Sequence, residues 1–512
     1  MQPIRLIAGF FTVGAWTMLS RVFGFLRDIL LAAKLGDGPV AEAFVVAFSL
    51  PNMFRRFFAE GAFNMAFVPM FSRKLEGERD AIGFARDAFS GLAGLLIVFT
   101  LLAQIAMPWL VLAMASGFAG DVRFGLATEF GRIAFPYILF ISLAALLSGV
   151  LNATGRFAAA AAAPVLLNLT LIGAMVGADR AGGDVGLALA WGVPVAGIAQ
   201  LALVWLAAAR AGFRLIPRMP RLTPELKRLA VIAAPAMLAG GVMQINLIVG
   251  RQVASYFDGA IQYLNLADRL YQLPLGVVAI AIGVVLLPDL SRKLEADDTA
   301  GGRAAFNRAT EFALLLTVPA AVALIVIPQP VVSVLFERGA FDAEAVAATA
   351  TVTAIYGAGL PAFVLQKVLQ PLFFARSDTV TPFRCAVAAM VVNAVLAIGL
   401  APLIGFTAAA WATTLAGWAM VALLWWASRP LGAAAEFDAR LRRRLLRILG
   451  ASAAMGALLV AVDAALGASL YQETLRYLAL IALIGAGLIG YAAAALVMGA
   501  ASLEDLRRAL RR

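Results

Sequence analysis

The 512-residue chain contains no histidine and a single cysteine, Cys385, and only 14% of its residues are charged. Without histidine, the chain lacks the commonest metal ligand and the usual proton carrier at neutral pH. One cysteine excludes an internal disulfide. No GxxxxGK[ST] phosphate-binding loop occurs, so nothing in the sequence indicates ATP hydrolysis. We therefore expect no metal site, no cofactor and no thiol chemistry.

Apolar residues, by contrast, are abundant and make up 62% of the chain. Charged residues account for about a quarter of a soluble globular protein, so this composition predicts a membrane protein. The apolar runs, such as the one that starts at Phe89, are continuous rather than alternating, which predicts helices and not a barrel. We predict an all-α polytopic fold of about 14 transmembrane helices, the first of which is retained because no cleavage site follows it.

Basic residues are distributed unequally between the two sides of the predicted bundle. Loops on one side contain 28 lysines and arginines, and loops on the other contain five: Lys34, Arg123, Arg180, Arg338 and Arg476. Cytoplasmic loops are the ones enriched in lysine and arginine, so we predict that both termini are cytoplasmic. This bias accounts for the net charge of +11, so no nucleic-acid partner is expected.

A short sequence repeat occurs once in each half of the chain. VPMFSRKLE at 68–76 returns as LPDLSRKLE at 287–295, so that SRKLE recurs 219 residues later. The copies follow the second and the eighth predicted helix. Because six membrane crossings, an even number, separate them, the two halves keep the same orientation, which predicts two parallel six-helix lobes. In transporters of this kind the substrate site lies between lobes that rock to expose it on either side. We predict lobes over 1–217 and 218–430, with a two-helix extension over 431–512.

Eight basic residues lie within or beside the predicted spans, namely Arg21, Arg27, Arg55, Arg56, Arg132, Arg251, Arg269 and Lys367. A basic group at mid-membrane costs about 2.5–3.5 kcal/mol, so it normally faces a partner or a water-filled cavity. Arginines outnumber the nearby acidic residues, which predicts a positive cavity that binds an anion. The planar guanidinium suits phosphate oxygens in particular.

Two neighbouring stretches hold four of these eight groups. In SRVFGFLRDIL, Arg21 and Arg27 can line one cavity, Asp28 can neutralise Arg27, and Gly24 can serve as a hinge. The stretch therefore predicts a polar face within the first helix.

In LPNMFRRFFAEG, Pro51 should bend the second helix next to Arg55, and Asn52 and Glu60 share a face with that arginine. NLADRLYQLPLG adds Asp268 and Arg269 from the eighth helix. Each predicted lobe therefore contributes arginine to the cavity.

Structural explanations stay open for several of these groups. Arg56 and Arg132 can snorkel to the membrane surface. The pairs Arg27 with Asp28 and Asp268 with Arg269 can be ion pairs that only stabilise the fold. Arg251 and Lys367 can be packing residues. The excess of positive charge among these eight residues favours a functional role for them as a group.

Four motifs together resemble one protein family over essentially the whole chain. They are SRVFGFLRD, LPNMFRRFFAEGAFNMAFVP, FPYILFISL from Phe135 and ADRLYQLPLGV from Ala267. The chain is similar in these motifs to the MurJ (MviN) lipid II flippases, within the multidrug/oligosaccharidyl-lipid/polysaccharide exporter superfamily. That resemblance implies two six-helix lobes plus two extra helices, in agreement with the count above.

The resemblance also implies a function and a site. Members of the family are inner-membrane flippases of bacteria, and the substrate would be lipid II, the undecaprenyl-pyrophosphate-linked precursor of peptidoglycan. The family's cavity arginines correspond to Arg21, Arg27, Arg55 and Arg269. Neighbouring family positions correspond to Asp28, Glu42, Asn52, Glu60 and Asp268, with Glu42 standing where relatives commonly carry aspartate.

Further expectations follow from the resemblance. The last two helices would form a groove for the lipid tail. Sodium coupling is not expected, because the relevant helices offer Asn246 and Asn393 instead of clear carboxylates. Membrane lipid and cell-wall synthases would be partners of a monomeric protein, and the membrane potential would drive rocking of the lobes.

Three other functions were weighed against this one. A drug or cation antiporter of the same superfamily would need an acidic cavity. A membrane enzyme acting on a lipid phosphate would use Asp28 or Glu60 as a base, and would be expected to show an acidic metal-binding cluster at the interface. A scaffold for cell-wall synthases would tolerate substitutions in the cavity.

Overall fold

The computed structural model describes residues 3–58, 62–77, 80–281, 287–296, 298–472 and 474–501. Over these ranges the fold is helical, and the one isolated β-bridge joins Arg338 to Phe341. Ten of the described helices are long and apolar enough to cross a membrane. The predicted all-α membrane fold is therefore confirmed, whereas the total of about 14 spans remains a prediction.

The chain divides into two compact units, and the predicted lobe boundaries at 217 and 430 remain predictions. One unit comprises Met1–Gln262 with Arg338–Phe341, and the other comprises Tyr263–Glu337 with Asp342–Arg512. The division falls inside helix α10, Ala260–Ala281.

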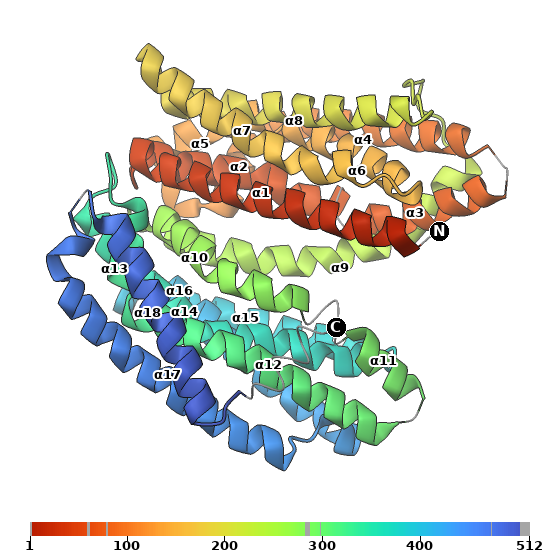
Figure 1. Cartoon of the computed structure of the whole chain (residues 1–512). Coiled ribbons are helices and arrows are strands. Elements are labelled where there is room, and N and C mark those ends of the chain that lie inside the picture. The colour runs from red at the N-terminus through yellow and green to blue at the C-terminus, as the bar shows by residue number, and fades with distance from the viewer. Residues whose placement is uncertain are drawn as a thin grey trace. The chain divides into compact units, whose positions relative to one another are not determined.

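The first unit is built from long helices, among which α7 and α8 lie side by side along their length (Figure 1). Its elements are α1 (Pro3–Leu35), α2 (Pro39–Phe58), α3 (Ala62–Glu76), α4 (Ala81–Met114), η1 (Ser116–Phe118), α5 (Val122–Ala134), α6 (Tyr137–Ala153), α7 (Ala158–Ala181), α8 (Val185–Arg210) and α9 (Pro224–Ala254).

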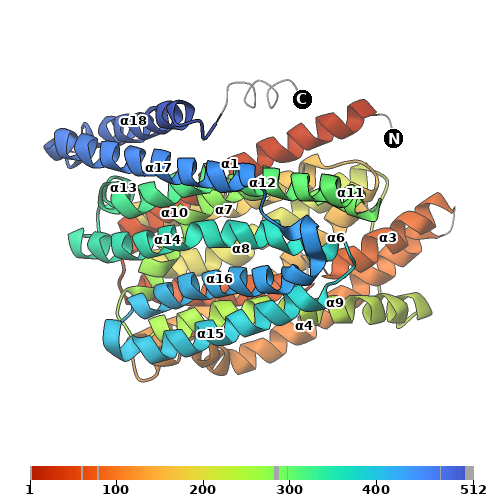
Figure 2. The same ribbon diagram turned by 90° about the horizontal axis from the view of Figure 1, so that it is seen from below.

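The second unit ends in a pair of helices, α17 and α18, that lie side by side in both views (Figures 1 and 2). After α10 its elements are α11 (Leu287–Glu295), α12 (Thr299–Val326), α13 (Pro328–Phe336), α14 (Ala343–Phe374), α15 (Val380–Ile404), α16 (Thr407–Ser428), η3 (Arg429–Ala435), α17 (Ala439–Leu466), η4 (Gly467–Leu470) and α18 (Arg476–Val497). Leu459 of α17 and Leu483 of α18 are buried in one apolar cluster with Val334 of α13.

Seven of the described helices begin at a residue whose side chain caps the first turn. The first N–H groups of a helix have no partner within the helix, and an aspartate or threonine oxygen can accept one of them. Side chains in this role are Asp80, Asp121, Asp184, Thr223, Asp298, Asp342 and Asp438. Polar residues between apolar runs therefore set where these helices start.

The span predicted over 40–70 is described as two helices, α2 and α3, with residues 59–61 between them outside the described ranges. Pro51 lies inside α2, where it supplies no N–H to the helix. Glu60 and the side chain of Arg56 lie outside what the structure describes. The predicted roles of Pro51 and Glu60 therefore remain predictions.

Large apolar side chains cover the outer faces of several helices. Ile398 on α15 is 66% exposed and Ile489 on α18 is 73% exposed. In water such surfaces would be unfavourable, but in a bilayer they face hydrocarbon of the same polarity. The exposed apolar surface agrees with the spans inferred from the sequence.

A short segment before α14 packs onto the end of α1 within the first unit. The N–H of Ala340 donates to the carbonyl of Ala33 over 2.9 Å. Gly339 has a φ of +59°, and a Cβ added there would lie 2.1 Å from the Ala33 carbonyl oxygen. Only glycine fits this contact without strain.

Gly339→Ala should therefore lower the thermal stability of the purified protein. The left-handed backbone alone disfavours alanine by about 1–2 kcal/mol, and the clash with Ala33 adds to that. Gly120→Ala is the matched control, because Gly120 has a φ of +81° but open space around it. Equal losses of melting temperature for the two variants would contradict this view of the contact.

Candidate functional site

Arg27 is a buried guanidinium in the middle of α1, 7% exposed. Its Nε and Nη2 both donate to Asp28 Oδ1, over 3.1 and 2.7 Å, and its Nη1 donates to Asn168 Oδ1 on α7 over 3.0 Å. The ring of Phe48 lies 5.9 Å from the guanidinium carbon. The ion pair that the sequence predicted between Arg27 and Asp28 is thus present, and a third residue orients it.

Asn168 connects this arginine to the backbone of α1. Its Nδ2 donates to the carbonyl of Ser20 over 3.0 Å, while its Oδ1 accepts from Arg27. A Cβ at Gly24 would lie 3.5 Å from Nδ2 of Asn168, an ordinary contact distance. Helix α1 runs unbroken through Gly24 in this structure, so the hinge remains a prediction.

The other predicted residues of the first unit are less enclosed. Arg21 is exposed on α1, and Arg55 on α2 is half-buried. Asn52 donates to the carbonyl of Phe48, one turn earlier in α2, over 2.8 Å. Its amide therefore supports the backbone of the helix that presents Arg55.

Glu42, predicted as a supporting residue of the site, is the centre of a buried ion-pair network. Its Oε2 accepts from Arg123 Nη1 over 2.9 Å, and its Oε1 accepts from the N–H of Ile261 over 3.0 Å. Glu42 is 1% exposed and Arg123 is 5% exposed. The network links the first turn of α2 to α5 and to the first turn of α10, within the first unit.

Two more carboxylates complete the network around Arg123. Nη2 of Arg123 lies 2.6 Å from Asp121 and 3.1 Å from Asp258, and the ring of Phe118 is 4.7 Å from the guanidinium carbon. The backbone N–H of Arg123, together with its side chain, lowers the pKa of Asp121, which lies in the loop before α5. Asp121 therefore supports the network at neutral pH, and this support is lost only as the pH falls below its usual range.

Sequence reasoning treated Arg123 as an ordinary loop residue. Its partner Glu42 lies 81 residues away, so no local spacing reveals the pair. The one available signal is Asp121, an N-cap residue placed two positions before an arginine at the start of an apolar run.

The predicted residues of the second unit lie on α10. Asp268 and Arg269 are half-buried, and Gln272 donates to Oδ2 of Asp268 one turn later. Tyr271 packs between Tyr356 and Phe363, with ring centroids 5.1 and 5.4 Å away. Aromatic packing thus fixes the segment of α10 that bears Arg269.

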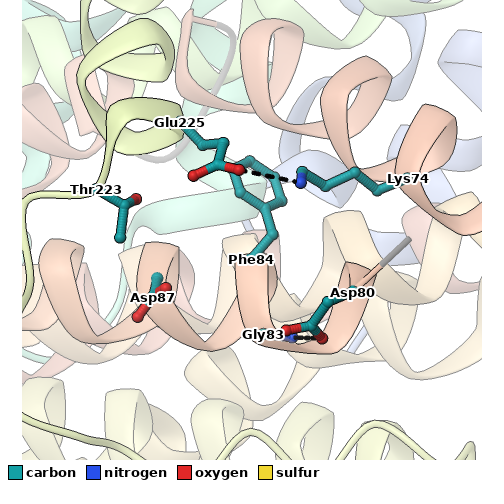
Figure 3. A pocket seen from close by; sticks show the side chains of 7 residues that line it. All are labelled: Lys74, Asp80, Gly83, Phe84, Asp87, Thr223 and Glu225. Carbon is teal, nitrogen blue, oxygen red and sulfur yellow. Dashed lines mark hydrogen bonds and ion pairs between the residues drawn. The ribbon is translucent and has the colours of Figure 1, made fainter.

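A pocket of about 160 Å³ lies where α3, α4 and the start of α9 meet (Figure 3). Lys74 reaches Glu225 over 3.4 Å, Asp80 caps α4, and Asp87 accepts from Arg218 Nε over 2.6 Å. The pocket is lined by three carboxylates and one cation, Lys74. This pocket does not suit a pyrophosphate, and its interactions instead hold helix ends together.

The arrangement around Arg27 can bind an anion. A guanidinium has five N–H groups, and the contacts to Asp28 and Asn168 use three of them. One N–H group on Nη1 and one on Nη2 remain for a ligand, and guanidinium N–H groups bind phosphate oxygens well. Arg21 on α1 and Arg55 on α2 add two positive charges. The acidic residue of the α1 motif SRVFGFLRD is Asp28.

Comparison with known proteins gives a consistent result. A family model described as "Lipid II flippase MurJ" matches residues 31–486. A "Probable lipid II flippase MurJ" of Rhizobium meliloti is 46% identical over 99% of this chain and 97% of its own. A "Lipid II flippase MurJ" of Burkholderia cenocepacia is 37% identical over 78% of this chain and 80% of its own.

Solved structures agree on the fold. A structure titled "Lipid II flippase MurJ, inward closed conformation" aligns with a TM-score of 0.78 at 24% identity, covering 98% of this chain and 99% of that one. An inward-facing multidrug transporter of the MATE family aligns with a TM-score of 0.66 at 15% identity, covering 83% of this chain and 98% of that one. From the family model and the relatives together, the chain belongs to the lipid II flippase MurJ family.

Proposed function

We propose that this multi-pass membrane protein moves lipid II from the cytoplasmic to the periplasmic leaflet of the inner membrane by alternating access. Membership of the family supports the substrate. The observation that carries the site is Arg27, a buried cation in a membrane helix that keeps donor groups for a ligand beyond Asp28 and Asn168. Arg21, Arg27 and Arg55 bind the pyrophosphate in this proposal.

The remaining parts of the proposal come from the family pattern and from the charges of the loops. Arg269 belongs to the second unit, and its part in binding the pyrophosphate rests on the family pattern. The cytoplasmic location of both termini is proposed from the charges of the loops. The monomeric state and the contact with cell-wall synthases are proposed from the resemblance. Sodium is not needed, since the arginines compensate the anion directly.

Asp28 acts in this proposal as an exchangeable counter-ion. With no substrate bound, it neutralises Arg27 inside the membrane, where an unpaired charge would be costly. When the pyrophosphate arrives, the guanidinium turns its remaining N–H groups to the phosphate oxygens. Asn168 keeps the side chain in place during the exchange because it holds Nη1 independently of Asp28.

The direct test is translocation of fluorescent lipid II in proteoliposomes, read by the loss of fluorescence when a quencher outside meets exposed headgroups. The purified full chain should move lipid II without ATP. No movement by protein that is folded and correctly inserted would contradict the proposal. Movement of a drug cation, with no movement of lipid II, would instead favour the antiporter.

An imposed membrane potential should change the rate of the same reaction. Moving one charge through 100 mV changes its energy by about 2.3 kcal/mol, so an inside-negative potential should speed outward movement of the anionic headgroup. The rate is compared at zero and at inside-negative potentials set by potassium gradients. Equal rates at both settings would exclude the potential as the driving force.

A further inference from the structure

A run of arginines opens α17 in the second unit. The sequence RLRRRLLR covers 440–447 and follows Asp438, whose side chain caps the helix. Arg440, Arg443, Arg444 and Arg447 are spaced at i, i+3, i+4 and i+7, so they share one face of the helix. These four side chains line a pocket of about 260 Å³.

One carboxylate orients half of this arginine cluster. Glu311 of α12 accepts from Arg444 and, over 3.2 Å, from Nε of Arg440. Glu311 is 7% exposed, so it is held within the packed interface of α12 and α17. Four guanidinium groups thus line the pocket, and among the described residues Glu311 is the carboxylate that accepts from two of them.

The other two arginines that line the pocket, Arg443 and Arg447, are exposed. Arg447 donates to the carbonyl of Gly499, just beyond the end of α18, over 3.1 Å. The start of α17 and the end of α18 therefore meet at this pocket. Neither exposed arginine is needed to hold Glu311.

Exposed apolar side chains flank the arginine cluster. Leu446 on α17 is 71% exposed, and Val497 at the end of α18 is 88% exposed. Beyond them both helices continue as apolar membrane spans. A ligand here meets a dense positive charge at one end and hydrocarbon-like surface at the other.

We propose that this pocket binds the phosphodiester headgroup of an anionic glycerophospholipid, whose acyl chains lie against α17 and α18. Basic pockets between helices at the cytoplasmic side of membrane proteins suit such headgroups. A free phosphate would use the arginines but not Leu446 and Val497. The site lies on α12 and α17 and is independent of the transport proposed for Arg27.

The experiment uses the full chain in detergent, titrated with phosphatidylglycerol and followed by native mass spectrometry. Removing two basic groups by Arg443→Gln with Arg447→Gln should weaken binding about 30-fold, and Arg443→Gln alone should weaken it about fivefold. Arg442→Gln is the matched control, because Arg442 lies on the same helix but outside the pocket. Its affinity should equal that of the unaltered chain.

Parallel titrations with phosphatidylcholine and with sodium phosphate identify the ligand. Binding of phosphatidylglycerol well above both supports the proposal. Equal binding of phosphatidylcholine, equal binding of sodium phosphate, or an equal loss in Arg442→Gln would each overturn it. Unchanged melting temperature of the lipid-free variants shows that a measured loss is a loss of the site and not of folding.

Discussion

Arg27→Ala should abolish translocation of lipid II and should fail to support growth of cells depleted of their own flippase. The change removes charge-assisted hydrogen bonds worth about 1.5–3 kcal/mol each, so pyrophosphate binding should weaken by at least about tenfold. Arg27→Lys should recover only part of the activity, since an ammonium cannot contact Asp28, Asn168 and a phosphate in one plane. Translocation in proteoliposomes and growth are the two measurements.

The same substitution also breaks the buried ion pair of Arg27 with Asp28, and removing one partner of such a pair destabilises a protein by about 3–5 kcal/mol. The double variant Arg27→Ala with Asp28→Asn separates the two effects. It should regain thermal stability because no buried charge is left, but it should still not transport. Recovery of transport in the double variant would mean that Arg27 only supports the fold.

Arg156→Ala serves as the control for loss of a basic residue. Arg156 is exposed in the turn between α6 and α7, so its removal should change neither growth nor stability. Full growth with Arg27→Ala at normal protein levels would contradict the proposed site outright.

Arg123→Gln should strongly destabilise the first unit. It leaves the Glu42 carboxylate, 1% exposed, with the N–H of Ile261 but without its cation, and breaking such a buried pair costs about 3–5 kcal/mol. Melting of the detergent-solubilised protein measures the loss. Adding Glu42→Gln should recover much of the stability, because the unpaired charge then disappears.

The pair formed by Lys34 and Asp179 provides a matched comparison. Its side chains are 35% and 41% exposed, with 2.6 Å between Nζ and Oδ2. Exposed pairs contribute about 0–1 kcal/mol, so Lys34→Gln should hardly change the melting temperature. A similar small loss for Arg123→Gln would show that burial of Glu42 has little energetic importance.

The sequence predicted the fold class and the chemistry of the first helix because both depend on local signals. Apolar runs identify membrane helices by length, and adjacent residues such as Arg27 and Asp28 can pair without knowledge of the fold. The pairing of Asn168 with Arg27 was missed, although an asparagine in the apolar stretch VLLNLTL is itself a signal of a polar contact.

Contacts between distant segments could not be predicted in the same way. Arg123 and Glu42 are 81 residues apart, and nothing in either local sequence specifies the other. Helix ends depend on capping and packing that hydropathy does not report.

The two SRKLE copies have the same residues but form different interactions. In the first copy Lys74 reaches Glu225 at the start of α9, so it joins two helices. In the second, Lys293 pairs over 2.7 Å with Asp289 of its own helix, at the register where the first copy has Met70. One of the residues that differ between the copies thus changes the partner of the lysine, so the same motif joins two helices in one place and braces a single helix in the other.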